Sequence, residues 1–339
     1  MIARPTSDAV VIGLGIMGAA ALYHLARVGL KVVGIDARGP SHVEGSSHGD
    51  TRIFRRAYWE GEHYVPLLNR AFDGWLALNE ATDQEVCHRT GGLFLGSPKS
   101  ALVRKSLKTA RNCGIEHEAL DATEIRARFP AFQIGDDVEG VFEPSALMLF
   151  AESARLAFLR LAVAAGATIA YGDPVTAINR KGRESLAIEG RGWSIHCGKA
   201  IVTAGPWLPR LLPHDVGTLF RPQRIPVFWF DPVPGSATNF AVERFPLFLL
   251  ETTDGSLVYG LPKWRDVRGG VKIGFHNKQL SDVDLDQPRP PARREEADEL
   301  WQAFNPTLPG LVREARGTSC IYTMTPDENF IIDRSIDRE

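Results

Sequence analysis

The sequence has little net charge and no long apolar run. Its 339 residues carry a formal net charge of -2, which gives no general attraction to nucleic acid or to anionic membranes. A membrane-spanning helix needs about 20 consecutive apolar residues. The one candidate, residues 9–22, is shorter and is interrupted by three glycines. We therefore expect neither nucleic acid nor a membrane among the partners.

Cysteine is also scarce, and it has no CxxC or other metal-type spacing. In a chain of this length the four cysteines indicate reduced, mostly buried thiols of a cytoplasmic protein without a metal site. They are Cys87, Cys113, Cys197 and Cys320. A secretory signal is the alternative interpretation of the apolar N-terminal run. Against it, Arg4 is the only basic residue ahead of the run, and no clear A-x-A cleavage site follows.

What the sequence does contain is typical of a globular protein. Hydrophobic residues make up 44% and charged residues 24%, which excludes the disordered and fibrous classes. The length predicts one large domain or two interleaved domains.

The first forty residues predict a strand, a helix and a second strand. Residues 9–12 form a β-branched run, and the glycine-rich turn from Gly13 to Gly18 follows directly. A helical apolar pattern then ends at Gly29, and residues 31–35 form a second apolar run before Asp36. This order is the context in which a GxGxxG turn indicates dinucleotide binding.

Each residue of the turn has a physical task in that interpretation. Gly13 allows the tight turn, Gly15 lets the backbone approach a pyrophosphate, and Gly18 lets the helix pack closely on the strand. The helix N-terminus favours the phosphates, and Asp36 can accept hydrogen bonds from ribose hydroxyls. The unit does not decide between FAD and NAD, and Asp36 argues only against a 2′-phosphate.

The segment from Pro40 to Arg55 reads PSHVEGSSHGDTRIFR. It resembles the monomeric sarcosine oxidase and N-methyltryptophan oxidase family, in which a GSxHGDTRxxR segment passes beneath the flavin. Further blocks keep the order of the family along the chain: residues 57–58, 60–61, 64–67, 142–144, 201–207, 259–262, 272–276, 320–323, 327–328 and 330–333.

The resemblance implies an α/β protein with a Rossmann-like FAD-binding domain interleaved with a smaller, antiparallel-sheet substrate domain. The FAD-binding domain is expected in residues 1–80, 145–220 and 315–339, and the substrate domain in residues 81–144 and 221–314. Between these blocks, a helix is expected over residues 151–165, strands over 168–171, 186–189 and 199–202, and a helix around 300–304.

The resemblance also implies the site residues. FAD is expected to contact Gly13, Gly15, Gly18, Asp36, Ser46, His48, Thr51, Arg52, Val175, Gly205 and Trp207, with a covalent bond to Cys320. The catalytic residues are expected to be Arg52, Arg55, Tyr259, Lys272, His276 and Tyr322. Arg55 would hold a substrate carboxylate, Lys272 would assist the reaction with oxygen, and His276 would lie near the substrate amine.

Without the family, the same residues leave alternatives open. Arg52 and Arg55 lie in a Gly/Ser-rich stretch expected to be loop or the start of a helix. They could clamp a carboxylate or form a solvated basic patch with Arg56. Lys272 and His276 share one face of a predicted strand, which could equally be the wet face of an ordinary sheet.

The implied activity is oxidation of N-methyl or cyclic secondary amino acids such as sarcosine, N-methyltryptophan or pipecolate. A hydride passes from the carbon next to nitrogen to flavin N5, water hydrolyses the imine, and O2 is reduced to H2O2. The enzyme is expected to be a monomer. Family chains continue beyond the block at residues 330–333, so a C-terminal segment of the family is expected to be absent. The alternatives are a non-catalytic or truncated flavin-binding remnant and an NAD-dependent dehydrogenase.

Overall fold

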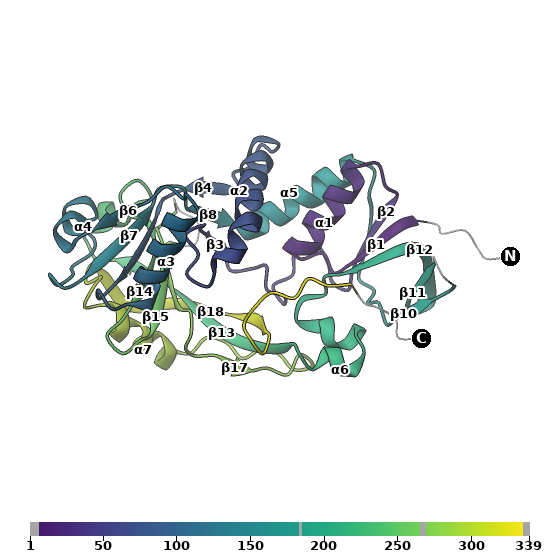
Figure 1. Ribbon diagram of the computed structural model, residues 1–339. Helices are drawn as coiled ribbons and strands as arrows, with labels where there is room; N and C mark the ends of the chain where they lie inside the picture. The colour runs from purple at the N-terminus through teal and green to yellow at the C-terminus, as the bar shows by residue number, and fades with distance from the viewer. Residues whose placement is uncertain (1–6, 183–184, 265–268, 335–339) are drawn as a thin grey trace.

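The computed structural model describes residues 7–182, 185–264 and 269–334. Two large β-sheets dominate it, one toward each end of an elongated molecule (Figure 1). The ends of two expected domain segments, residues 1–6 and 335–339, lie outside the described residues. Within the described part of the chain, no helix is both long enough and apolar enough to cross a bilayer.

The smaller of these sheets is the Rossmann-like one. Its strand order is β10-β11-β12-β1-β2-β9, with β12, β1, β2 and β9 parallel. The strands are β1 (Ser7–Ile12), β2 (Val32–Asp36), β9 (Thr168–Tyr171), β10 (Ala177–Arg180), β11 (Leu186–Gly190) and β12 (Trp193–Val202). Helices α1 (Ile16–Arg27) and α5 (Ala151–Ala164) pack together beside this sheet, around a core that includes Val11, Leu22 and Phe158.

The larger sheet has nine strands and is antiparallel except where β14 runs parallel to β5. Its strands are β5 (Gly92–Gly96), β6 (Glu118–Leu120), β7 (Glu139–Glu143), β13 (Arg221–Pro232), β14 (Leu247–Glu251), β15 (Leu257–Leu261), β16 (Val271–Phe275), β17 (Ser281–Asp282) and β18 (Leu311–Met324). Its core is rich in phenylalanine, and each fully buried ring contributes about 1.5–3 kcal/mol; Phe132, Phe230, Phe248 and Phe304 are members.

A three-stranded sheet lies between the two large ones. Its order is β3-β8-β4, from β3 (Thr51–Phe54), β4 (Cys87–Arg89) and β8 (Leu147–Phe150). The remaining helices are α2 (Val65–Glu80), α3 (Ala101–Asn112), α4 (Ala122–Arg128), α6 (His214–Gly217) and α7 (Arg294–Phe304), with 3-10 turns η1 (Glu62–Tyr64), η2 (Gly205–Leu211) and η3 (Ala237–Phe240).

The α/β class is confirmed, and several local expectations need correction. Residues 315–324, assigned to the FAD-binding domain, lie in β18 and pair with β13 of the nine-stranded sheet. Arg52 lies in a strand rather than a loop or helix start, because β3 pairs with β8. Helix α7 begins at Arg294, well before residue 300. Cys113 is only half-buried, whereas Cys87, Cys197 and Cys320 are buried.

Candidate active site

A cavity of about 600 Å³ opens beside the glycine-rich turn. Its wall comes from the ends of β1, β2 and β12, the loop after β2 and the turn η2, which are distant in sequence. Eight expected cofactor residues line it: Gly13, Gly15, Asp36, Ser46, His48, Val175, Gly205 and Trp207. The structure therefore brings most of the expected cofactor contacts into one cavity.

The N-terminus of α1 lies at this cavity and is capped by Gly15 without a side-chain hydrogen bond from the cap. One of its backbone donors, Ile16 N, binds Ser47 Oγ at 3.0 Å. Met17 is 65% exposed although it belongs to an apolar helix face. The N-terminus of the helix thus points backbone donors and positive dipole charge at the cavity, as a pyrophosphate requires.

Gly18 does not line the cavity but allows α1 to reach it. A Cβ atom at Gly18 would lie 1.8 Å from Gly13 O and 2.6 Å from Thr203 Oγ1. Gly13 itself has φ of +91°, a conformation that residues with a side chain rarely adopt. The two glycines therefore fix the turn in the way expected for the motif.

Asp36 ends β2 and is almost buried at the cavity. Its carboxylate accepts hydrogen bonds from Leu14 N at 2.7 Å and from Arg38 N at 2.9 Å. Each carboxylate oxygen can accept more than one hydrogen bond. Asp36 thus holds the glycine turn and keeps acceptor capacity for ribose hydroxyls.

Basic side chains that sequence reasoning missed also line the cavity. Buried Arg155 of α5 donates to Leu14 O at 3.4 Å and to Pro40 O. The Arg38 guanidinium lies 3.9 Å from the centre of the Trp207 ring. Arg155 is one of the buried residues of α5. A charged residue on the apolar face of a predicted helix was the sequence feature that could have indicated it. These cations suit a ligand that carries phosphate charge.

Lys272 of β16 is buried, and its ammonium is bound by backbone of the segment before and at the start of β3. Nζ donates to Gly49 O at 2.6 Å and to Thr51 O at 2.7 Å. Burial, with a smaller contribution from Arg52, lowers the pKa of Lys272 to about 7. The alternative that Lys272 lies on a solvent-exposed face of an ordinary sheet is therefore wrong.

Arg52 and Cys320 lie close to the same segment. The Arg52 guanidinium donates to the carbonyl oxygens of Ser46, His48 and Thr51, at 2.7–2.8 Å. A Cβ atom built on Gly49 would lie 3.3 Å from Cys320 Sγ. Neither Arg52 nor Cys320 lines the 600 Å³ cavity, so they mark a second part of the site, beyond His48.

The two expected pocket tyrosines belong to this second part. Tyr259 of β15 and Tyr322 of β18 pack on the apolar group that contains Cys320 and Trp229. Burial raises the pKa of both phenols, and nearby Tyr322 and Cys320 raise the pKa of Tyr259 further. Both phenols are therefore neutral hydrogen-bond donors at neutral pH.

Arg55 and His276 form a third group. The Arg55 guanidinium makes a two-pronged ion pair with Glu60, at 3.0 and 2.7 Å, and lies 4.4 Å from the centre of the Tyr58 ring. Burial and then the charge of Arg55 lower the pKa of His276. The imidazole is therefore neutral at neutral pH. Sequence reasoning missed the role of Glu60, although a carboxylate five residues from an arginine was visible.

Glu143 at the end of β7 holds the chain that follows Arg55. Its carboxylate is fully buried and accepts hydrogen bonds from Arg56 N at 3.0 Å and Ala57 N at 2.9 Å. Ser145 Oγ donates to it at 2.7 Å. The Arg56 guanidinium also donates to Ser145 Oγ at 2.9 Å, so Arg56 belongs to a structural network and does not form the solvated patch that was the alternative for this stretch.

The cavity fits the ADP half of FAD. Its donors, its ribose-binding carboxylate and its cations match pyrophosphate and ribose, and Val175 and Leu211 add apolar wall for a base. The groups around Lys272 and Arg55 continue from the same loop toward the nine-stranded sheet.

Comparisons with known proteins agree with this geometry. The sequence profile of the family described as FAD dependent oxidoreductase matches residues 8–338. The chain is 35% identical to the monomeric sarcosine oxidase of Streptomyces avermitilis over 97% of this chain and 85% of that protein. It is 36% identical to the N-methyl-L-tryptophan oxidase of Salmonella agona over 96% of this chain and 85% of that protein.

Solved structures share the fold at low identity. NikD, an amino acid oxidase of nikkomycin biosynthesis, superposes with a TM-score of 0.79 at 21% identity, covering 95% of this chain and 83% of NikD. The L-proline dehydrogenase of P. horikoshii gives a TM-score of 0.79 at 18% identity, covering 98% and 86%. The family match also decides for FAD over NAD. The chain belongs to the FAD-dependent oxidoreductases that act on CH–NH groups, as an amino-acid or amine oxidase of the sarcosine oxidase type.

Proposed function

We propose that this protein oxidises N-methyl or cyclic secondary amino acids of the sarcosine, N-methyltryptophan or pipecolate type. The observation that carries the proposal is the buried ammonium of Lys272, bound to Gly49 O and Thr51 O of the segment that continues from the cofactor cavity. A structural lysine would seldom be buried without a carboxylate partner. A cation placed there can stabilise negative charge that develops during reduction of oxygen.

When bound, FAD would supply the redox chemistry, which is acceptance of a hydride from the carbon next to nitrogen and transfer of the two electrons to O2 to give H2O2. The protein supplies binding, orientation and proton positions. Arg55 offers the substrate carboxylate a two-pronged partner, for which the substrate must compete with Glu60. Neutral His276 can accept a proton from the substrate amine, which keeps the nitrogen lone pair free.

Cys320 is the proposed site of covalent attachment. Its side chain is buried, and its Sγ lies opposite Gly49 at the segment bound by Arg52 and Lys272. The other thiols lie elsewhere: Cys87 Sγ donates to Trp75 O, Cys113 directly follows α3, and Cys197 lies in β12. The proposal also includes a monomeric enzyme in the cytoplasm.

One experiment tests cofactor and attachment together. The visible spectrum of the purified protein is recorded before and after acid precipitation, with the Cys320→Ser variant as control. We expect flavin absorption that stays with the pellet in the wild type and moves to the supernatant in the variant. Colour that is released from the wild type would refute the covalent bond while leaving FAD binding intact.

A second experiment tests the substrate class. Peroxide release is followed while sarcosine, N-methyltryptophan or pipecolate is supplied to the flavin-loaded protein. Turnover of at least one secondary amine is expected. A loaded protein that reduces its flavin with none of them would instead support the second candidate, a flavin-binding remnant without catalysis.

A further inference from the structure

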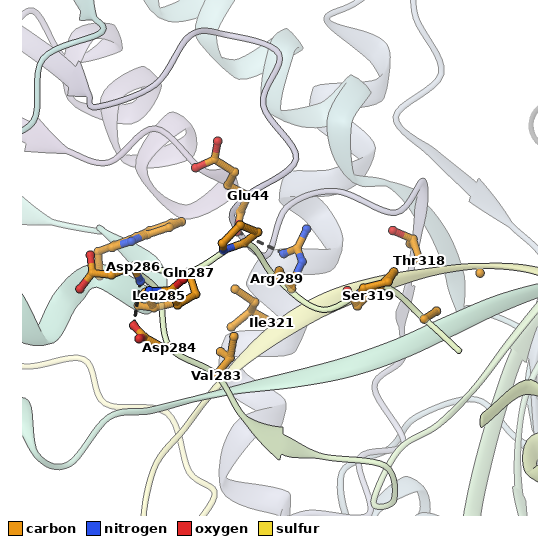
Figure 2. A pocket seen from close by; sticks show the side chains of 15 residues that line it. Glu44, Val283, Asp284, Leu285, Asp286, Gln287, Arg289, Thr318, Ser319 and Ile321 are labelled. Atoms are coloured by element: carbon orange, nitrogen blue, oxygen red, sulfur yellow. Dashed lines mark hydrogen bonds between the residues drawn. The ribbon is translucent and has the colours of Figure 1, made fainter. Parts of the chain in front are cut away.

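A second cavity, of about 580 Å³, lies on the other side of the loop that walls the cofactor cavity. It is lined by Glu44, by residues 283–289, 291 and 292, and by residues 317–319 and 321 of β18, many of which Figure 2 labels. Trp207 lines both cavities, and Glu44 is followed directly by Gly45 and Ser46 of the cofactor cavity. A thin wall made by residues 43–46 and Trp207 therefore separates the two.

Arg289 crosses the second cavity to reach that wall (Figure 2). Its guanidinium donates to Val43 O at 2.6 Å and to Glu44 O at 3.2 Å. These contacts join residues 245 and 246 positions apart in the sequence. The Val43 side chain is exposed, and residues 43–46 belong to no helix or strand. Their position therefore depends on contacts such as these.

The residue that follows Arg289 is fixed to the nine-stranded sheet. Pro290 O accepts hydrogen bonds from Ser319 Oγ at 2.7 Å and from Arg224 Nε at 2.9 Å. Arg224 is buried and makes a two-pronged ion pair with Glu296 of α7, at 2.8 and 2.9 Å. Arg289 thus extends from a backbone position that is fixed to the sheet. One of the residues that fix it, Ser319, directly precedes Cys320 in β18.

Three cations bind carbonyl oxygens of one continuous stretch, residues 43–51. Arg289 binds it at Val43 and Glu44, Arg52 at Ser46, His48 and Thr51, and Lys272 at Gly49 and Thr51. Arg52 and Lys272 hold the part beside Cys320. Arg289 holds residues 43 and 44, directly before Gly45 and Ser46 of the cofactor cavity, and Arg52 binds the cavity residues Ser46 and His48 as well. Of the three cations, Arg289 comes from the connection between β17 and α7.

We propose that Arg289 is a positioning residue that clasps the 43–46 loop over bound FAD and so slows release of the cofactor. The inference rests on the proposed FAD site, and it adds a contribution from the substrate domain to closing that site. A guanidinium suits this role because its planar fork reaches two adjacent carbonyl oxygens.

The test uses the Cys320→Ser background, in which FAD stays exchangeable whether or not the wild type binds it covalently. FAD dissociation is measured by the recovery of flavin fluorescence after dilution. Arg289→Met should speed dissociation roughly tenfold and change association little, since loss of a few contacts acts mainly on the off-rate. Arg289→Lys, which keeps one charged donor, should recover part of the effect.

The matched control is Arg294→Met, because Arg294 is an exposed arginine of α7 with a single long contact to Asp298 at 3.9 Å. It should leave the off-rate unchanged. Hydrogen exchange of the FAD-free protein gives a readout independent of the cofactor: Arg289→Met should raise exchange in residues 43–51 while the thermal midpoint stays within about 2 °C, as expected of a surface change.

The outcomes separate the two claims. If the Cys320→Ser protein binds no FAD, the proposed function fails. If it binds FAD and Arg289→Met releases the cofactor at the parental rate, the clasp is wrong and the function stands. A general loss of stability in Arg289→Met with no local rise in exchange would also overturn the clasp.

Discussion

The cofactor end and the substrate end of the site are built in different ways. The cofactor cavity has the glycine turn in its wall and the N-terminus of a helix beside it, without a side-chain cap on that helix. The substrate end is made of side chains that already have partners, because Arg55 is paired with Glu60 and the Lys272 ammonium with two carbonyl oxygens. The helix N-terminus at the cofactor end is therefore available to a ligand, whereas Arg55 at the substrate end must exchange Glu60 for the substrate carboxylate.

The largest effect is expected at the cofactor end, from Gly18→Ala. A single methyl group there would lie 1.8 Å from Gly13 O, so the turn must shift. We expect FAD affinity to fall by about 100-fold or more, measured by flavin fluorescence titration. Gly74→Ala in α2 is the control, since a Cβ at that position meets nothing within 4 Å.

The control variant Gly74→Ala is expected to change stability in the opposite direction to a disruptive substitution. Alanine in a helix interior is favoured over glycine by about 0.5–1 kcal/mol, so Gly74→Ala should raise the free energy of unfolding and keep the affinity for FAD. If Gly18→Ala bound FAD as well as the parent, close packing of the turn would not be what shapes the cofactor end.

At the substrate end, Lys272→Met should slow reoxidation of the reduced enzyme on the order of 100-fold, the usual cost of removing one preorganised electrostatic group. The side chains are similar in length, so packing in β16 is largely kept. Stopped-flow mixing of anaerobically reduced enzyme with O2 measures the rate. Reduction by the amine should change far less, and an equal loss in both half-reactions would argue for a general defect.

The sequence predicts the features whose residues are neighbours in the chain, and it does not predict contacts between residues that are distant in the chain. The glycine turn, Asp36 and the helix after the turn are local, so spacing alone was enough to place them. The contacts from Lys272 to Gly49 O and Thr51 O join residues more than 200 positions apart, and no periodicity carries that information. The family resemblance placed Lys272 near the flavin but not its acceptors.

Strand pairing shows the same limit. A Gly/Ser-rich stretch around Arg52 favours loop locally, yet Thr51–Phe54 becomes β3 because β8, nearly 100 residues later, supplies its partners. Residues 315–324, expected in the FAD-binding domain, pair in β18 along almost all of β13 in the nine-stranded sheet. The choice of partner for a long strand is a tertiary property.

The lowered pKa of Lys272 also makes the free energy of unfolding depend on pH. Burial brings the pKa to about 7 in the folded protein, whereas an unfolded lysine titrates near roughly 10.4. Between these values the unfolded chain binds more protons, so folding becomes more favourable as pH rises, by up to about 1.4 kcal/mol per pH unit. Below about pH 7 the two states bind the same number, and the slope disappears.

Urea denaturation of the FAD-free protein at several pH values measures this slope. The difference in unfolding free energy between the parent and Lys272→Met should shift in favour of the parent from about pH 7 to pH 10. Lys278→Met is the control, because Lys278 lies on the surface with Asp254 at 2.7 Å. A difference that stays constant over this range would contradict a buried, readily deprotonated lysine.

The mildest change, Glu60→Gln, addresses the exchange of partners directly. Arg55 is 7% exposed and Glu60 26% exposed in their side chains, so the pair is partly shielded from water and competes effectively with a substrate carboxylate. The amide keeps the size of the side chain and removes its charge. We expect KM for a secondary amino acid to fall several-fold, up to about tenfold, with kcat nearly unchanged.

If the substrate carboxylate replaces Glu60 on Arg55, the decrease in KM caused by Glu60→Gln must depend on Arg55. Arg55→Ala should raise KM by about tenfold or more, and in that background Glu60→Gln should no longer lower KM, since coupled residues give non-additive changes. Steady-state kinetics of the two single variants and the double variant measure the coupling. An equal decrease in KM with and without Arg55 would mean that Glu60 acts on the substrate by simple charge repulsion, and the substrate end would then be as open to its ligand as the cofactor end.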